Sequence, residues 1–245
     1  MHRVMVAGGT GKTGREVVRY LSSRADMNVV GVLGRKYVGS DMRCVLANFD
    51  SQVPILDNFR EAVDKTSPTI WVDFSPPEVA KEHFLPSVLL GIHPIIGSTG
   101  FSADEMQAFS RLCEKHGLGG ALIPNFSLGA LIMLQAARLA AQVFNEAAIV
   151  DIYNPDKREC PSGTSKLMVK EMKKVSGFKH KDISTHSLRL SGVLPHQEVV
   201  FGGDGESLTI QHDVSDRQCY GPGVAKAILS INRFERLVTD LGEFL

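Results

Sequence analysis

The sequence contains few cysteines, no excess of either charge and no metal-binding motif. Its four cysteines, at positions 44, 113, 160 and 219, form no C-x-x-C pair, so we expect free thiols in a reducing compartment. The chain has 27 basic and 27 acidic residues, and this balance argues against nonspecific binding to nucleic acid or to a membrane surface. The eight histidines show no H-E-x-x-H or similar spacing, so we expect no metal site.

Long apolar runs are also missing. The most apolar stretch, residues 128–144, is interrupted by Gln135, Arg138 and Gln142, which predicts a core helix rather than a membrane span. No signal peptide precedes the first apolar run, so we expect a cytoplasmic protein, or a stromal one in a plastid-bearing source. The hydrophobic content of 43% is ordinary for a globular chain, and 245 residues allow one large domain or two modest ones.

The first motif present is a glycine-rich turn near the amino terminus. Residues 3–7 suit a buried strand, residues 15–21 have helical spacing, and the glycines between them read G-x-x-G-x-x-G. In this context glycine allows the close approach of a pyrophosphate, which then rests on the helix N-terminus. The pattern predicts a dinucleotide site; the alternative is a turn without a ligand. The candidate residues are Gly8, Gly9, Thr10, Gly11, Lys12 and Thr13.

The end of the second predicted strand, residues 27–33, bears on the choice between NAD and NADP. An NAD-selective site places an acidic residue there, about 20 residues past the glycines, to bind the ribose 2′-hydroxyl. This chain has no acid at that point and carries Arg35 and Lys36 instead. Two cations suit a 2′-phosphate, so NADPH is the predicted cofactor and NADH the alternative. A solvated turn with two surface charges would show the same residues.

Strands and helices alternate up to residue 126, which predicts a parallel sheet wound by helices. Ser102, with Glu105 three residues later, predicts a capping box for the last helix of this half. We expect ligand-binding loops at the carboxyl edge of the sheet, namely the glycine turn, Arg35, Phe74–Ser75, Gly97–Thr99 and Asn125–Phe126. The predicted strands are residues 69–74, 93–96 and 120–123, and the predicted helices are residues 55–63, 78–90 and 103–116.

After residue 126 the pattern changes to strands with few helices between them, which predicts an open mixed or antiparallel sheet. The basic run 170–181 is interpreted as a solvated helix end. Residues 224–240 are predicted to be helical and to return to the first domain. The predicted strands are residues 148–153, 185–190, 198–201 and 207–212, with a turn at residues 202–205 and a long helix at residues 128–144.

A second candidate site lies in residues 153–164, which read Tyr-Asn-Pro-Asp-Lys-Arg-Glu-Cys-Pro-Ser-Gly-Thr. Ser162, Gly163 and Thr164 precede a helical run, so backbone N–H groups and the helix dipole there favour an anion. Lys157, six residues before Gly163, adds a full positive charge. The predicted ligand is a small anion such as a carboxylate; the alternative is an ordinary helix cap beside a surface lysine.

Taken together, these blocks resemble the dihydrodipicolinate reductases of lysine biosynthesis over nearly the whole chain. The matching blocks are residues 8–14, 72–75, 97–101, 125–129 and 161–164, with a weaker match at residues 189–201 that includes His196 and Phe201. The resemblance implies an α/β fold, with an N-terminal Rossmann-type parallel sheet and a C-terminal α+β domain that carries an open mixed sheet. In that family hydride from a nicotinamide reduces a cyclic, dicarboxylated imine-type substrate.

The resemblance also implies which domain binds which ligand and which residues take part. Residues 1–126 with 219–245 would bind the dinucleotide, and residues 127–218 would bind the small anionic substrate and build a homotetramer. The implied catalytic residues are Lys157 and Tyr153. The implied substrate contacts are Asn154, Gly163, Thr164 and Thr99. Besides the glycine turn, Arg35 and Lys36, the implied cofactor contacts are Phe74, Gly97, Ser98, Thr99, Asn125 and Phe126.

One departure from the family pattern falls in the second site. Family members carry two adjacent histidines before the lysine, the first as catalytic acid and the second as a substrate contact. Here Tyr153 and Asn154 stand in those places, and Cys160 replaces a small alanine. This leaves a reductase of the same or a related imine, or else a non-catalytic dinucleotide-binding sensor or assembly factor. The retained Lys157 and residues 161–164 favour the enzyme.

Overall fold

The computed structural model describes residues 1–175 and 183–245 and divides the chain into two compact units. The first consists of Met1–Ser127 and Arg217–Leu245, and the second of Leu128–Asp216. Both ends of the chain thus belong to the first unit. The expected boundaries, 1–126 with 219–245 and 127–218, differ from this division by one or two residues. The part of the basic run 170–181 beyond residue 175 lies outside the described residues.

The described part of the first unit is built on a parallel sheet of seven strands in the order β11-β6-β5-β4-β1-β2-β3. The order runs in opposite directions on either side of the β1–β4 pair. Such a switch point is where open α/β sheets bind ligands. The strands are β1 (His2–Ala7), β2 (Met27–Leu33), β3 (Ile55–Leu56), β4 (Ile70–Asp73), β5 (His93–Ile96), β6 (Gly120–Leu122) and β11 (Leu237–Val238).

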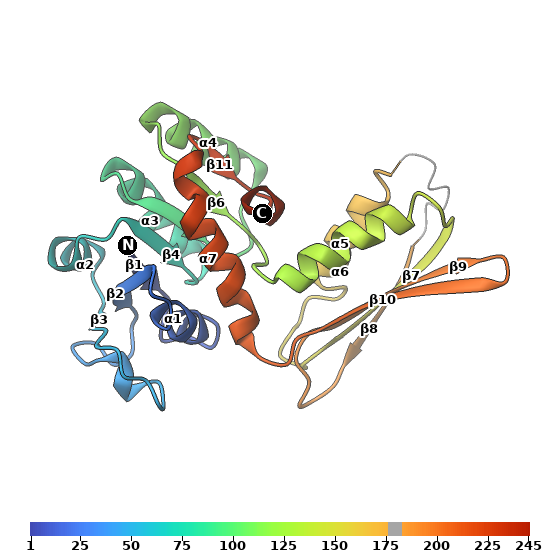
Figure 1. The fold of residues 1–245 in the computed structure, drawn as a ribbon, viewed down its shortest axis with the longest axis horizontal. Coiled ribbons are helices and arrows are strands. Elements are labelled where there is room, and N and C mark those ends of the chain that lie inside the picture. The colour runs from blue at the N-terminus through green and yellow to red at the C-terminus, as the bar shows by residue number, and fades with distance from the viewer. Residues whose placement is uncertain (176–182) are drawn as a thin grey trace. The chain divides into compact units, whose positions relative to one another are not determined.

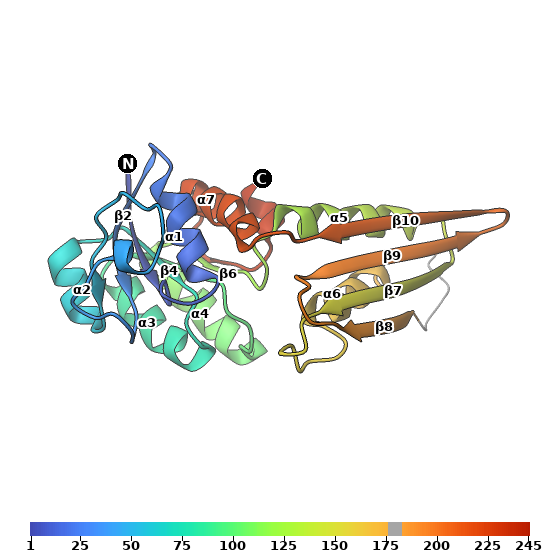
Figure 2. The same ribbon diagram turned by 90° about the horizontal axis from the view of Figure 1, so that it is seen from below.

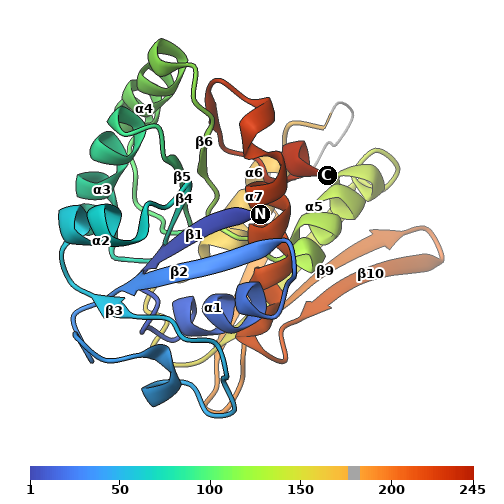
Figure 3. The ribbon, with the colours of Figure 1, turned by 60° about the vertical axis from the view of Figure 1, so that its left-hand side comes forward.

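Helices cover both faces of this sheet, with α2, α3 and α4 on one face and α1 and α7 on the other (Figure 3). The strands between these layers are buried on both faces, and residues 4–7 of β1 are fully buried. Ser102 and Glu105 form the expected capping box at the start of α4. The helices are α1 (Gly14–Ser22), α2 (Phe59–Thr66), α3 (Pro77–Leu89), α4 (Ala103–His116) and α7 (Gly221–Ser230).

The prediction of a helix at residues 55–63 was wrong at its start. Ile55 and Leu56 extend the sheet as β3, paired with Val32 and Leu33 of β2. The helix begins later, at Phe59, because the side chain of Asn58 accepts a hydrogen bond of 3.0 Å from the backbone N–H of Glu61. Burial of two apolar residues on a sheet edge thus decides their conformation.

The prediction of a helix over residues 224–240 was correct up to Ser230 and wrong beyond it. Helix α7 ends at Ser230, a single 3-10 turn covers Ile231–Arg233, and Leu237–Val238 then form β11. Leu237 pairs with Gly120 of β6, and both β11 residues are buried. The expected return of this segment to the first domain is observed.

The second unit holds a mixed sheet of four strands, in the order β10-β9-β7-β8 within the described residues (Figure 2). The pair β7–β8 is parallel and the other pairs are antiparallel, so the mixed form of the two expected sheets is correct. The hairpin turn is narrower than expected, because Gly202 and Gly203 belong to β9. The strands are β7 (Glu146–Tyr153), β8 (Ser184–Arg189), β9 (His196–Gly203) and β10 (Glu206–Asp213).

Two helices, α5 (Leu128–Ala140) and α6 (Gly163–Met172), cover one face of the mixed sheet (Figure 1). Helix α5 ends at Ala140, four residues before the predicted end. The core between helices and sheet includes Met133, Ala137, Ile149, Met168 and Phe201. Among the described helices of both units, none has the length and apolar character needed to cross a membrane.

Candidate functional site

The glycine turn of residues 8–14 connects the end of β1 to the start of α1. Gly8 has a φ of 69°, and a Cβ on it would lie 2.7 Å from the carbonyl carbon of Phe74. A Cβ on Gly14 would lie 2.3 Å from the carbonyl oxygen of Gly8, so α1 packs directly against the turn. Thr13 makes no side-chain capping bond to α1. The turn therefore offers a close backbone approach and an N-terminus without a side-chain cap, the two features that suit a pyrophosphate.

The loop after β2 adjoins this turn. A Cβ on Gly34 would lie 2.8 Å from the hydroxyl oxygen of Thr10, so the two loops touch. Arg35 and Lys36 follow directly, and their side chains are exposed. Two cations directly after Gly34, which touches the glycine turn, suit a 2′-phosphate at the ribose end of a dinucleotide.

Phe74, after β4, joins the other loops at the carboxyl edge. Its ring meets the Phe126 ring edge-on with centroids 6.1 Å apart, and a Cβ on Gly97 would lie 2.3 Å from a Phe74 ring carbon. Next to Gly97, the hydroxyl oxygen of Ser98 is buried and has no hydrogen-bond partner among the described residues. The structure therefore brings these expected cofactor residues together, with a buried polar atom in their midst.

A buried carboxylate that the sequence reasoning missed holds the Phe74 loop. Asp73 is fully buried at the end of β4 and accepts a hydrogen bond of 2.8 Å from the backbone N–H of Ser75. It also bonds His83 of α3 at 2.7 Å and the indole N–H of Trp71 at 3.2 Å. A charged side chain at the end of an apolar strand was the available signal, because such a group needs partners when buried.

In the second unit, the loop between β7 and α6 places a lysine beside a helix N-terminus. A helix begins at Gly163, as both readings of this segment required, and Ser162 caps it by accepting a hydrogen bond from the backbone N–H of Ser165. This cap is the feature that the alternative reading, an ordinary helix cap, expected. The ammonium of Lys157 lies 3.1 Å from one carboxylate oxygen of Glu159, and that of Lys166 lies 2.9 Å from the other. Hydrogen bonds from Lys166 and then Lys157 lower the pKa of Glu159.

The carboxylate of Glu159 also adjoins the first residue of α6. A Cβ on Gly163 would lie 3.7 Å from one of its oxygens. Two ammonium groups and a helix N-terminus therefore surround a single carboxylate, an arrangement that we call the anion cradle (Lys157, Lys166 and Gly163). The sequence reasoning identified Lys157 and Gly163 but not Lys166 or Glu159, which read as ordinary surface charges.

Beneath the anion cradle lies a fully buried carboxylate, Asp151 of β7. One oxygen accepts hydrogen bonds from the backbone N–H of Ser162 at 2.9 Å and the hydroxyl of Ser165 at 2.7 Å. The other accepts one of 2.9 Å from Arg189. Burial alone would raise the pKa of Asp151, but these hydrogen bonds outweigh it and lower the pKa to about 2. A carboxylate inside an apolar strand was the unused signal in the sequence.

The remaining predicted residues lie as follows. Tyr153 is the last residue of β7, and the Arg189 guanidinium lies 5.5 Å from its ring centroid. Asn154 is exposed, and its side-chain oxygen accepts a hydrogen bond of 3.1 Å from the backbone N–H of Asp156. Thr164 lies in the first turn of α6. Thr99, predicted to contact both ligands, belongs to the first unit and is exposed.

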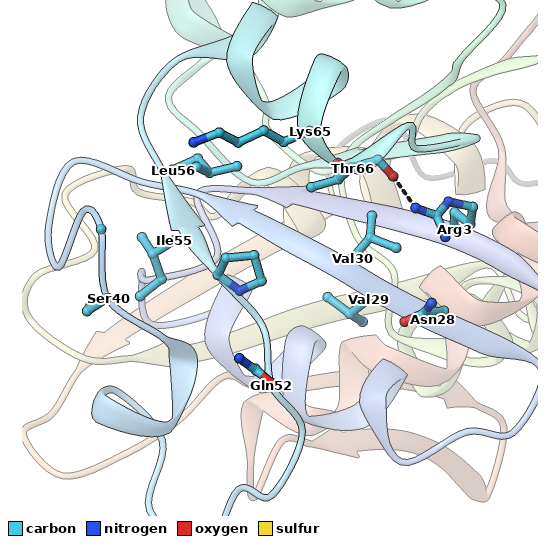
Figure 4. Close-up of a pocket in the computed structure, with 12 residues that line it drawn as sticks. Arg3, Asn28, Val29, Val30, Ser40, Gln52, Ile55, Leu56, Lys65 and Thr66 are labelled. Atoms are coloured by element: carbon cyan, nitrogen blue, oxygen red, sulfur yellow. Dashed lines mark hydrogen bonds between the residues drawn. The ribbon is translucent and has the colours of Figure 1, made fainter.

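One surface pocket of about 530 Å³ lies elsewhere in the first unit (Figure 4). It is lined by parts of β2, β3 and α2, and Arg3 at its rim donates a hydrogen bond to the carbonyl oxygen of Thr66. Its lining contains none of the predicted site residues. Within the described residues there is no group of three or more histidine, cysteine, aspartate or glutamate side chains that would hold a metal ion.

A parallel sheet with a glycine turn at its switch point, and a separate unit with an anion cradle, define a dinucleotide-binding protein with a second domain for a small anion. The chain belongs to the dihydrodipicolinate reductase family. The model of the N-terminal part of that family matches residues 2–126, and the model of its C-terminal part matches residues 129–245. The family and fold class expected from the sequence are thereby confirmed.

Full-length relatives carry the same assignment. The 4-hydroxy-tetrahydrodipicolinate reductase of Thermosynechococcus vestitus is 32% identical, and the match covers 99% of this chain and 96% of the relative. The enzyme of that name from Moorella thermoacetica is 34% identical, and the match covers 99% of this chain and 97% of the relative. A solved structure, dipicolinate-bound dihydrodipicolinate reductase from Paenisporosarcina sp. TG-14, has a TM-score of 0.84 and 30% identity, and all of both chains is covered.

Proposed function

We propose that this chain reduces a cyclic, dicarboxylated imine-type substrate with NAD(P)H, as in the 4-hydroxy-tetrahydrodipicolinate reductase step of lysine and diaminopimelate biosynthesis. One observation in the second unit carries the proposal. The anion cradle already holds a carboxylate, that of Glu159, between the ammonium groups of Lys157 and Lys166. Because the two lysines bind the carboxylate of Glu159, they have the charge and the hydrogen-bond donors to bind a substrate carboxylate in its place.

The first unit supplies the dinucleotide site. The residues fit the group: the backbone at Gly8 leaves no room for a Cβ, α1 has no side-chain cap, and the hydroxyl of Ser98 lacks a partner among the described residues. A nicotinamide dinucleotide held by these residues would supply the hydride for the reduction. Arg35 and Lys36 favour the 2′-phosphate, so NADPH is the proposed cofactor, with NADH accepted less well.

The second unit binds and orients the substrate. A substrate carboxylate displaces Glu159 and takes its place beside Lys157, while the backbone N–H groups of Gly163 and Thr164 complete the site. Asn154 and, from the first unit, Thr99 are the proposed further contacts. Dipicolinate, which is bound in the related Paenisporosarcina structure, has two carboxylates and should compete for this cradle.

Hydride addition leaves an electron-rich centre that must take a proton. We assign a polarising hydrogen bond to Tyr153, whose phenolic hydroxyl is a hydrogen-bond donor. Lys157 or water then delivers the proton. In this scheme Lys157 is the principal catalytic residue and Tyr153 assists it.

A non-catalytic sensor or assembly factor on the same fold is the second candidate function. The observation in its favour is the pair Tyr153 and Asn154 at the place of the family's two histidines. A sensor has no evident need for the anion cradle, so the cradle favours the enzyme. Turnover is the property that separates the two functions.

We also propose a homotetramer formed through the uncovered face of the mixed sheet. Helices α5 and α6 cover one face, and the other presents Val150 and Ile152 of β7, Val200 of β9 and Leu188 of β8, which is 47% exposed. Light scattering on the purified chain should give the mass of four chains of 26.7 kDa each. A monomeric mass at micromolar concentration would contradict this.

The experiment that tests the proposed function is a spectrophotometric assay. NADPH oxidation by the purified chain should depend on added, freshly prepared dihydrodipicolinate-type substrate. It should be inhibited competitively by dipicolinate. Tight NADPH binding without turnover would favour the sensor instead.

A further inference from the structure

The segment that carries Lys157 has little apolar packing of its own. Between the end of β7 at Tyr153 and the start of α6 at Gly163, most side chains are exposed, and Lys157 is half-buried. One backbone hydrogen bond, from the Lys157 N–H to the Asn154 carbonyl, lies within this loop. Catalysis needs the reacting groups held to within about 1 Å, so something outside the loop must fix it.

Arg189, the last residue of β8, reaches into this loop. Its Nε donates a hydrogen bond of 3.0 Å to the carbonyl oxygen of Lys157, and its Nη2 donates one of 2.7 Å to the carbonyl oxygen of Glu159. The guanidinium thus holds the backbone at two points on either side of Arg158. The planar fork of donors makes this possible, because it addresses separate acceptors in fixed directions.

The same guanidinium is also hydrogen-bonded to the strands β7 and β8. Its Nη1 donates hydrogen bonds to the carboxylate of Asp151 at 2.9 Å and to the carbonyl oxygen of Leu188 at 2.7 Å. Asp151 in turn holds the backbone N–H of Ser162 and the hydroxyl of Ser165, and Gln197 of β9 bonds that hydroxyl at 3.1 Å. The network therefore joins the middle of the loop to the capped start of α6.

Arg189 also contacts the other proposed catalytic residue. Tyr153 and Arg189 are register partners at the ends of the parallel strands β7 and β8, and the guanidinium lies 5.5 Å from the tyrosine ring centroid. A cation at that distance from a ring is a favourable contact and restricts the ring's orientation. One side chain thus orders both Tyr153 and the Lys157 loop.

The donors of Arg189 are mostly engaged by the protein itself. A guanidinium has five N–H donors, and four hydrogen bonds to the chain are present, to Lys157, Glu159, Asp151 and Leu188. Its side chain is 19% exposed. This leaves little capacity for binding a substrate carboxylate, so a role through other residues fits the geometry better than direct contact.

We infer that Arg189, anchored by Asp151, is the positioning residue that sets Lys157 and Tyr153 in place for the proposed reduction. The inference rests on the proposed function for the identity of the reaction, but the ordering of the loop does not depend on it. Kinetics therefore test the effect of Arg189 on the reaction, and hydrogen exchange tests its effect on the order of the loop.

The kinetic test compares Arg189→Met and Arg189→Lys with wild type. Arg189→Met should lower kcat/KM by about 10²-fold and raise KM for the substrate, because loss of the loop geometry weakens both binding and reaction. NADPH affinity should stay unchanged, since Arg189 and the glycine turn belong to different units. Arg189→Lys should restore little, because an ammonium keeps the charge but lacks the fork.

Controls separate positioning from a loss of folded protein. A partly unfolded variant would lose kcat per total chain at an unchanged KM, and its NADPH stoichiometry would fall in proportion. Arg158→Met removes an exposed arginine from the same loop and should leave KM within about twofold of wild type, the scale of a surface change. Added guanidinium should partly restore Arg189→Ala, whereas added methylammonium should not.

Hydrogen exchange tests the inference even if wild type does not turn over. In Arg189→Met the backbone amides of residues 156–160 should exchange faster, while amides in the middle of β7 keep their protection. An unchanged exchange rate in the loop would overturn the inference. So would full activity in Arg189→Met, or full rescue by Arg189→Lys, which would show that charge alone is needed. An inactive wild type with faster loop exchange in the variant would instead overturn the proposed function alone.

Discussion

At the residue scale, the cations that follow β2 bear on the choice of cofactor. Arg35 and Lys36 are exposed beside the glycine turn, at the position where an NAD-selective site carries an acid. NADPH should therefore bind more tightly than NADH, and Arg35→Ala should narrow the gap. A charge-assisted phosphate contact contributes about 1.5–3 kcal/mol.

Calorimetry at matched salt measures both affinities. Arg60→Ala is the matched control, because Arg60 is an arginine on α2 whose side chain is 72% exposed. It should leave the ratio of the two affinities unchanged. Equal affinity of wild type for NADPH and NADH would contradict the assignment of Arg35.

Tyr153 is the residue whose chemistry departs most from the family pattern. A histidine, with an unperturbed pKa of about 6.5, supplies a proton near neutral pH, whereas tyrosine, at about 10, donates a hydrogen bond but gives up its proton less readily. Turnover should therefore rise in Tyr153→His. Tyr153→Phe should cost less than Lys157→Met. Steady-state kcat on the same substrate measures all three variants.

Two results would overturn this account of Tyr153. An unchanged kcat in Tyr153→Phe would show that the tyrosine only packs against Arg189. A Tyr153→His variant slower than a fast wild type would show that tyrosine is a tuned part of a different site.

At the scale of elements, Asp151 links β7 to the start of α6. Its pKa is about 2 in the folded chain, against about 3.9 for an unperturbed aspartate. A depressed folded-state pKa means that the linkage stabilises the fold above about pH 4, and that this stability is lost as the pH falls towards 2. The shift corresponds to about 2–3 kcal/mol.

Asp151→Asn should accordingly be less stable than wild type at neutral pH, and the difference should shrink between pH 4 and pH 2, the window of that shift. Urea unfolding at a series of pH values measures it. Asp204→Asn, in the exposed turn of the β9–β10 hairpin, is the control and should be close to wild type throughout. A stability difference that does not change with pH would contradict the linkage.

Elements also show how far sequence patterns reach. Short apolar or strand-like runs predicted β1, β2, β5 and the four strands of the mixed sheet to within a few residues, because such runs and the turn residues that bound them are local signals. The errors at Ile55–Leu56 and Leu237–Val238 have one cause. Short apolar pairs are strands only because a neighbouring sheet edge pairs with them, and that edge is distant in sequence.

In the candidate site, too, local features could be predicted and contacts between distant residues could not. The glycine spacing and the start of a helix after Ser162 are local features and were predicted. Asp151 and Arg189 are 38 residues apart and meet only through the register of β7 and β8. The occupation of the anion cradle by Glu159 likewise depends on side-chain geometry that no spacing rule contains.

At the scale of the whole molecule, each unit carries one requirement of a reductase. The first has the glycine turn at the switch point of its sheet, and the second has the anion cradle held by Arg189 and Asp151. A sensor needs only the first. The central claim, that the chain is a working reductase, therefore depends on turnover that requires the second unit.

The most direct measurement is NADPH oxidation with freshly prepared dihydrodipicolinate-type substrate, for wild type, Lys157→Met and Lys170→Met. Lys170 is an exposed lysine on α6 and serves as the matched control. We expect substrate-dependent oxidation in wild type and Lys170→Met, and a loss of at least about 10²-fold in Lys157→Met with unchanged NADPH affinity. Nearly full activity in Lys157→Met would contradict the site, and no oxidation by wild type would contradict the function.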